Sequence, residues 1–154
     1  MKIHKLIGPQ NVYLDLAATD VASALATVAE RFAPELDLDP EIVVEALLER
    51  EGLGSTSVGE GFAIPHCKIQ GLQQIGIAIA RFSDGVAFGG AGDDPVRFVF
   101  VVLSPPDQPA AHLQVLSQIA RVLKRRELRV ELLSASDAAD VVQRICRVAE
   151  EEGL

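Results

Sequence analysis

Apolar residues recur every three or four positions near the start of the chain, a pattern that predicts an amphipathic helix. In residues 20–32 these positions are occupied by Val21, Leu25, Val28 and Phe32. Either Thr19 or Asp20 can cap the first turn through its side-chain oxygen. The preceding residues 11–16 alternate weakly between apolar and polar side chains, so we expect a short strand there.

A second helix is predicted over residues 40–52. It begins with Pro40 directly after Asp39, so a capping carboxylate precedes a proline whose missing N–H has no helical partner to lose. Gly52 marks its expected end. We expect this helix to bury Ile42, Val43, Ala46 and Leu47.

Two apolar runs, residues 75–82 and 96–103, are predicted to be strands, separated by the glycine-rich turn at 89–94. The second run is apolar on nearly both faces, which is typical of a central strand covered on both sides. We expect a helix to follow the proline turn at 104–109, with an apolar stripe formed by Leu113, Leu116, Ile119, Ala120 and Leu123. A short segment at 127–133 and a final helix over 136–150 complete the chain. Interspersed helices and strands predict an α/β fold: a single-domain sandwich over residues 1–154, with a mixed sheet flanked by helices on both sides.

Composition and charge exclude several functional classes. The chain has 154 residues, 49% of them apolar, and a formal net charge of −8, so a packed core is expected and nucleic acid is a poor partner. The longest apolar run, residues 98–103, is too short for stable membrane insertion. Because the N-terminus shows no export signal, we expect a cytoplasmic protein. Its two cysteines, Cys67 and Cys146, are formally able to pair but are expected to be reduced.

Three residues are candidates for chemistry. His66 follows Pro65, which stiffens the backbone before an imidazole that we expect at the end of a short strand. His112 lies just inside the helix after the proline turn, where the helix dipole favours an anion. Arg50 lies in the last turn of the second predicted helix. Taken singly, each has an ordinary structural interpretation: a solvated histidine, a helix-capping histidine and an arginine at a helix C-terminus.

The loop between the second helix and His66 is rich in glycine, and we do not expect a regular element in residues 52–61. Its spacing is not that of a P-loop, because Glu60 stands where a lysine would follow the second glycine. The third glycine of a dinucleotide-binding turn is also missing. Ser55 and Thr56 are most often turn-forming residues in such a segment.

Taken together, the motifs carry more information. Residues 50–56 read REGLGST, residues 59–66 read GEGFAIPH, and a PDQ…HL run follows at 106–113. This combination resembles the type 2 enzyme IIA proteins of the bacterial phosphotransferase system, the fructose, mannitol and nitrogen-regulatory class, over nearly the full length. The resemblance implies an α/β sandwich in which His66 accepts a phosphoryl group, assisted by His112 and Arg50. We further expect phosphoryl-binding support from the loop residues Ser55, Thr56, Gly59 and Gly61, since glycine amides can approach an anion closely.

The implied donor is an HPr-like phosphocarrier, and direct transfer between proteins requires neither a metal nor a cofactor. We expect a backbone carbonyl or a side chain to bind one nitrogen of His66 and leave the other free for phosphorus. Phe62, Ile64 and the nearby glycines are expected to form an apolar rim for the partner. Cys67 places an oxidisable thiol beside the site.

Alternative functions are less favoured by the sequence. A metal site from His66, Cys67, His112 and Asp107 has poor ligand spacing, and a serine hydrolase lacks its nucleophile motif. The serious alternatives concern the fate of the phosphoryl group once His66 carries it. The motif is closest to the nitrogen-regulatory branch, in which the phosphorylation state regulates target proteins. The alternative is a fructose/mannitol-type sugar-transport component that passes phosphate to a separate IIB domain.

Overall fold

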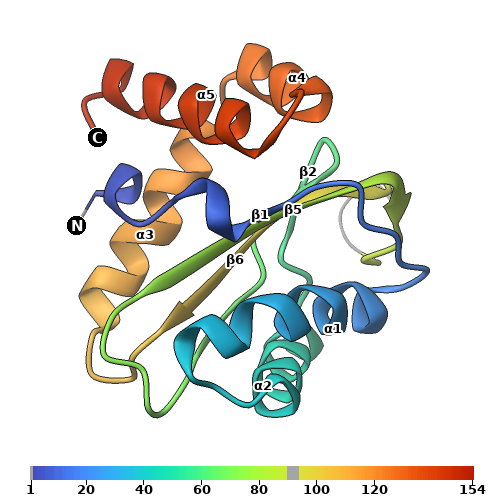
Figure 1. Ribbon diagram of the computed structural model, residues 1–154, viewed down its shortest axis with the longest axis vertical. Coiled ribbons are helices and arrows are strands. Elements are labelled where there is room, and N and C mark those ends of the chain that lie inside the picture. Colours follow the sequence, from blue (N-terminus) through green and yellow to red (C-terminus); the bar gives the residue numbers. More distant parts are fainter. Residues whose placement is uncertain (1, 90–93) are drawn as a thin grey trace.

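A mixed six-stranded sheet forms the centre of the molecule in the computed structural model, which describes residues 2–89 and 94–154 (Figure 1). The two long strands, β5 (Gly76–Val86) and β6 (Val96–Ser104), pair antiparallel. The remaining strands are short: β1 (Val12–Tyr13), β2 (Ser57–Gly59), β3 (Phe62–Ala63) and β4 (His66–Lys68). The order is β1-β5-β6-β3-β2, and β4 also pairs with β6. β6 is therefore central, as its apolar sequence predicted.

Helices cover both faces of this sheet (Figure 1). Helices α1 (Val21–Phe32) and α2 (Pro40–Gly52) lie on one face. Helices α3 (Pro109–Val122), α4 (Arg126–Ser134) and α5 (Ala138–Glu151) lie on the other. Single 3-10 turns occupy Ile3–Lys5, Pro9–Asn11 and Ala33–Leu36. The predicted α/β sandwich is confirmed.

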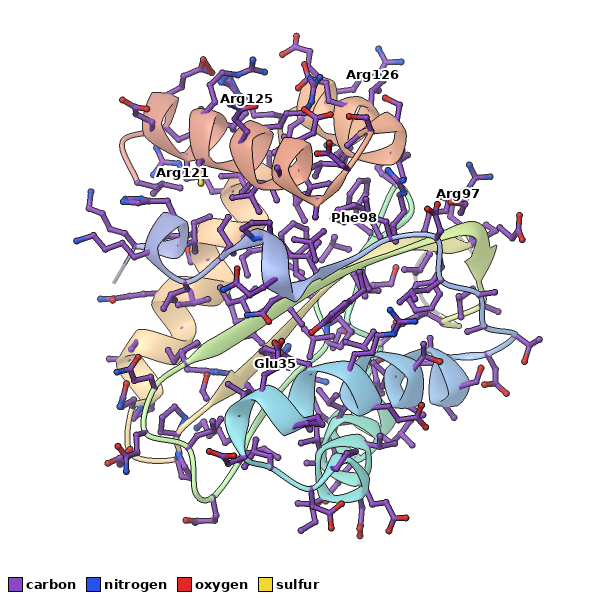
Figure 2. All side chains as sticks on the ribbon, viewed as in Figure 1. Glu35, Arg97, Phe98, Arg121, Arg125 and Arg126 are labelled. Carbon is purple, nitrogen blue, oxygen red and sulfur yellow. The ribbon has the colours of Figure 1, made fainter. Side chains whose placement is uncertain are left out.

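The alternation of β6 side chains explains why both faces are covered. Phe98, Phe100 and Val102 belong to the apolar cluster with α3 and α5, whereas Val99, Val101 and Leu103 belong to the cluster with α1 and α2. Successive residues of a strand point to opposite faces, so a strand that is apolar throughout requires two covering layers. Figure 2 shows Phe98, which is fully buried, between the sheet and the α4–α5 layer.

An aspartate side chain caps the first turn of both α1 and α2. Asp20 accepts a hydrogen bond from the Ser23 backbone N–H, and the Ser23 hydroxyl oxygen accepts one from the Asp20 N–H, a reciprocal pair that closes the first turn of α1. Asp39 accepts a hydrogen bond from the Glu41 N–H at the start of α2. Both predicted N-termini are confirmed.

Several local predictions were wrong. The first strand is only two residues long, because a 3-10 turn precedes it and Asp15 adopts a left-handed backbone conformation after it. The glycine-rich loop does contain a regular element, since β2 pairs with β3 through a turn in which Glu60 and Gly61 have positive φ. His66 opens β4 rather than ending a strand. Most of the predicted turn at 89–94 lies outside the described residues.

Two helix faces also differ from prediction. In α3 the buried residues are His112, Val115, Ile119 and Val122, so the helix is rotated by about one position and Leu113 is exposed. This rotation packs the His112 ring against β6, where it finds a hydrogen-bond partner. In α2, Val43 and Leu47 are buried but Ile42 is exposed.

Candidate functional site

His66 is held by the backbone immediately before it. Its Nδ1 lies 2.8 Å from the Ile64 carbonyl oxygen. A carbonyl oxygen only accepts, so Nδ1 carries the proton and Nε2 carries the lone pair in the neutral ring. β4 pairs in parallel with β6, with His66 opposite Val102, and the Val102 N–H donates to the Pro65 carbonyl. The half-buried imidazole is thus attached to the central strand.

His112 enters the site from α3. Its Nδ1 lies 2.6 Å from the Ser104 Oγ, at the end of β6, and the rings of His66 and His112 have centroids 5.4 Å apart. Ser104 is fully buried and His112 is 7% exposed. When the Ser104 hydroxyl donates to Nδ1, Nε2 of the neutral His112 carries the proton and is a hydrogen-bond donor.

Arg50 comes from the last turn of α2, as predicted. Its Nη1 donates to the Gly54 carbonyl oxygen at 2.9 Å, which bends the side chain back over the loop that follows the helix. One of the five guanidinium N–H groups is used in this contact, so several donors are left for an anion.

These three side chains line one open cavity of about 500 Å³. The complete lining is Ala46, Glu49, Arg50, Leu53, His66, Cys67, Lys68 and His112. Arg50 and Lys68 bring two positive charges, against the one negative charge of Glu49. This balance favours an anionic group near the histidines.

The titration of His112 reflects its surroundings. Burial lowers the pKa of its imidazole, and the electrostatic influence of the neighbouring His66 and Lys68 lowers it further. His112 therefore stays neutral at neutral pH, which suits a ring that donates one hydrogen bond and accepts another.

Cys67 is less reactive than its position in the sequence implied. Burial raises the pKa of its thiol to about 12, and the side chain is 8% exposed. The thiolate is the species that oxidises readily, so burial disfavours oxidation of Cys67, although the residue does line the cavity beside His66 as expected.

A chain of hydrogen bonds connects α2 to His66 through the glycine-rich loop. The Glu51 carboxylate accepts from the Thr56 hydroxyl and, at 3.1 Å, from the Thr56 N–H. The Thr56 carbonyl accepts from the Ile64 N–H at 3.0 Å, and the Ile64 carbonyl accepts from His66. Glu51 thus holds the loop against the segment that orients the imidazole.

None of the four predicted supporting residues is among the described residues that line this cavity. Thr56 is buried and its hydroxyl is bound to Glu51, while the Ser55 hydroxyl accepts from the Ser57 N–H. Gly59 and Gly61 have positive φ at the β2–β3 turn, a conformation that favours glycine. Their role in phosphoryl binding stays a prediction.

The predicted apolar rim was wrong. Phe62 is fully buried and Ile64 is 6% exposed, because β3 lies inside the sheet beside β6. The exposed apolar side chains near the histidines are Leu53, which lines the cavity, and Leu113, next to His112.

Sequence reasoning missed three residues of the site. Lys68 could have been found from the sequence, because alternate residues of a strand lie on the same face and His66 stands two residues before it. Nothing in the local sequence marks Ser104 or Glu51, since their partners, His112 and Thr56, are identified only by the folded chain.

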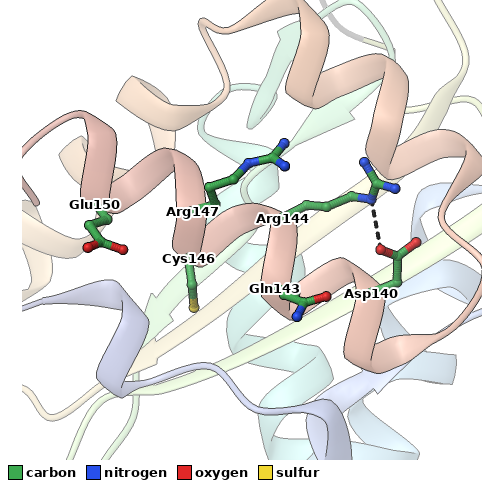
Figure 3. A pocket seen from close by; sticks show the side chains of 6 residues that line it. All are labelled: Asp140, Gln143, Arg144, Cys146, Arg147 and Glu150. Atoms are coloured by element: carbon green, nitrogen blue, oxygen red, sulfur yellow. Dashed lines mark hydrogen bonds and ion pairs between the residues drawn. The ribbon is translucent and has the colours of Figure 1, made fainter.

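Another hollow runs along α5, away from these histidines (Figure 3). Three of the four charged side chains that line it pair with neighbours: Arg144 contacts Asp140 at 2.8 Å, and Arg147 contacts Glu131. Internal pairing leaves little charge for a ligand.

In the part of the chain that the structure describes, no group of three His, Cys, Asp or Glu side chains could hold a metal ion. None of the described helices is long and apolar enough to cross a membrane.

Comparisons with known proteins agree with this arrangement. The nitrogen regulatory protein of Bradyrhizobium diazoefficiens is 35% identical over 138 residues, which cover 90% of each chain. The fructose-specific EIIA component of the phosphotransferase system of Haloferax volcanii is 36% identical over 112 residues, 73% of each chain. The crystal structure of nitrogen regulatory protein IIA-Ntr from Neisseria meningitidis superposes with a TM-score of 0.88 at 29% identity, covering 93% of this chain and 98% of that one. Residues 5–147 match the model of the family described as phosphoenolpyruvate-dependent sugar phosphotransferase system, EIIA 2. The chain therefore belongs to the type 2 EIIA family of the phosphotransferase system.

Proposed function

We propose that the protein is a cytoplasmic phosphocarrier in which Nε2 of His66 accepts the phosphoryl group. One observation carries the proposal: the Ile64 carbonyl binds Nδ1–H, so the lone pair is on Nε2, in a cavity that Arg50 and His112 also line. A fixed tautomer leaves one nucleophilic nitrogen and removes the need to select it during the reaction.

The transfer balances without a metal or an added base. The lone pair on Nε2 attacks phosphorus as the N–P bond of the donor's phosphohistidine breaks, and the bonding pair returns to the donor's ring nitrogen. The phosphorylated His66 then carries a proton on Nδ1 and phosphorus on Nε2, so its ring becomes positively charged. The Ile64 carbonyl oxygen, which binds Nδ1–H, stabilises that charge.

The other cavity residues act on the phosphoryl oxygens. Arg50 offers N–H donors in a planar fork, and His112 offers Nε2–H when Ser104 donates to its other nitrogen. Lys68 adds a positive charge at the exposed side of the cavity. Phosphoryl transfer depends mainly on such positioning and charge stabilisation.

A protein donor also requires a surface to dock on. Leu53 is 83% exposed and lines the cavity, so we assign to it the apolar contact with an HPr-like donor. Val130, an exposed apolar residue on α4, offers a matched control far along the chain from the cavity. Leu53→Asp should lower kcat/KM for the donor by about tenfold, the scale of a central interface contact, whereas Val130→Asp should not change it. Equal rates for both variants would overturn this assignment.

After phosphorylation, we propose a mainly regulatory role. Several relatives at 33–36% identity are named nitrogen regulatory protein, and this chain covers 74–94% of their length. Phosphate on His66 would add negative charge and acceptor oxygens at an exposed cavity, which is sufficient to change how a target protein binds. The fructose-specific relative supports the second candidate, transfer to a IIB domain for sugar uptake.

The experiment combines the protein with phosphoenolpyruvate, enzyme I and HPr, or the nitrogen-branch equivalents, and measures its intact mass. Wild type should gain one acid-labile phosphoryl group and His66→Ala none. Failure of wild type to gain it with any donor would overturn the phosphocarrier proposal. Incubating the phosphorylated protein with IIB domains then separates the two roles. Loss of the phosphoryl group to IIB supports transport, and retention supports regulation.

A further inference from the structure

Negative charge is concentrated in the α1–α2 layer. Residues 20–53 contain nine carboxylates and two arginines, so they carry a formal charge of −7, most of the −8 of the whole chain. Arg121, Arg125 and Arg126 lie on the other side of the sheet, with α3, α4 and α5 (Figure 2). The two layers of the sandwich therefore differ in charge as well as in position.

A groove of about 610 Å³ lies between α1 and α2 in this acidic layer. Its half-buried floor is apolar, and exposed carboxylates surround it. The floor consists of Ala26, Pro40, Val44 and Leu48, and the rim of Glu30, Asp39, Glu41 and Glu45. None of the described residues that line it is basic. The groove thus combines an apolar surface with four negative charges.

Most of the rim carboxylates have no side-chain interaction partner among the described residues. Asp39 caps the first turn of α2, but the side chains of Glu30, Glu41 and Glu45 form no hydrogen bond or ion pair there. Like charges in close proximity repel one another, and a positively charged ligand would relieve this repulsion.

The groove and the His66 cavity use different faces of α2. Glu41, Val44, Glu45 and Leu48 line the groove, whereas Ala46, Glu49, Arg50 and Leu53 line the cavity. At 3.6 residues per turn the centres of these two stripes lie well over a quarter of the helix circumference apart, and their nearest edges meet at Glu45 and Glu49. Val43 and Leu47 face the core. A ligand in the groove would leave His66 accessible.

We infer that this groove docks a basic amphipathic helix of a partner protein. The apolar face of that helix would contact Val44 and Leu48, and its lysine or arginine side chains would pair with the rim carboxylates. A second copy of this chain does not fit, because symmetric contact would bring two acidic layers together. An anionic membrane surface is disfavoured for the same reason. The inference does not depend on phosphorylation of His66.

The test uses a synthetic leucine–lysine peptide of about 15 residues, patterned as an amphipathic helix, in about 0.15 M salt. A scrambled peptide of the same composition controls for charge alone. Binding is measured by fluorescence anisotropy, and its location by NMR amide shifts. The peptide should bind tighter than its scrambled form and shift the amides of Ala26, Val44 and Leu48.

Charge-reversal variants decide whether the groove is responsible. Glu41→Lys/Glu45→Lys should weaken binding by about tenfold, since two ion pairs become repulsions. Glu127→Lys/Glu150→Lys makes the same change in net charge on α4 and α5 and should weaken it by less than about twofold. Equal weakening by both pairs, equal binding of the scrambled peptide, or shifts outside the groove would overturn the inference. His66→Ala should bind the peptide normally, so this inference and the phosphocarrier proposal fail separately.

Discussion

Replacement of Glu51 tests whether the hydrogen-bonded loop orients His66. Glu51→Ala removes the acceptor of two hydrogen bonds from Thr56, a residue that is 7% exposed. A hydrogen bond to a charged group contributes roughly 1.5–3 kcal/mol, and because Glu51 is half-buried, water can replace part of the loss. We therefore expect the free energy of unfolding to fall by about 2 kcal/mol, which in a protein of this size lowers Tm by about 4–8 °C.

The same change should slow phosphorylation. The Thr56 carbonyl accepts a hydrogen bond from the Ile64 N–H, and the Ile64 carbonyl accepts one from Nδ1–H of His66. A loosened loop therefore allows the imidazole to rotate or change tautomer. Small misplacements of a reacting group are costly, and we expect the rate at saturating donor to fall by about tenfold. Glu51→Gln retains one acceptor oxygen and should show a smaller effect in both measurements.

Thermal unfolding followed by circular dichroism gives the stability, and intact mass against time gives the rate. ¹⁵N NMR of the His66 ring distinguishes positioning from stability alone, because it reports which nitrogen carries the proton. Glu150→Ala, an exposed glutamate on α5, is the matched control and should change neither quantity. If Glu51→Ala lowered Tm but left the rate and the His66 tautomer unchanged, the positioning role would be refuted.

Three further predictions concern other buried polar groups. Because burial and nearby positive charge lower the pKa of His112, protonation of its imidazole destabilises the fold. The free energy of unfolding should therefore have its full value above about pH 6.5 and fall as the pH drops below it. His112→Gln should show a smaller fall. A steeper loss in the variant would contradict the assignment. The thiol of Cys67, whose pKa is raised to about 12, should react with N-ethylmaleimide at about pH 8 far more slowly than the half-buried Cys146. Peptide mass spectrometry measures both rates, and equal rates would show that Cys67 is accessible. Arg81 is buried, and its guanidinium donates hydrogen bonds to two backbone carbonyls at the end of α4. Arg81→Met should therefore lower the free energy of unfolding, measured by urea titration, by about 3 kcal/mol. A loss below about 0.5 kcal/mol would mean that these hydrogen bonds contribute nothing to stability.

Much of the architecture depends on local signals that the amino-acid sequence contains. Asp20 and Asp39 cap helices through neighbours two or three residues away, so the starts of α1 and α2 are visible without the fold. The continuous apolar run of β6 requires cover on both faces wherever the strand lies, and it predicted the sandwich. The segment from Pro65 to His66 and the positions of Arg50 and His112 likewise identified the three side chains that meet in one cavity.

Tertiary structure decided the features that depend on distant partners. Apolar residues occupy adjacent stripes of α3, so periodicity alone left its rotation open by one position, and the packing of His112 on Ser104 settled it. The same holds for Phe62: an apolar residue near a glycine loop can be rim or core, and pairing of β3 with β6 placed it in the core. A sequence specifies short-range hydrogen bonds and hydrophobic periods directly, whereas which polar groups meet across the sheet depends on how its layers pack.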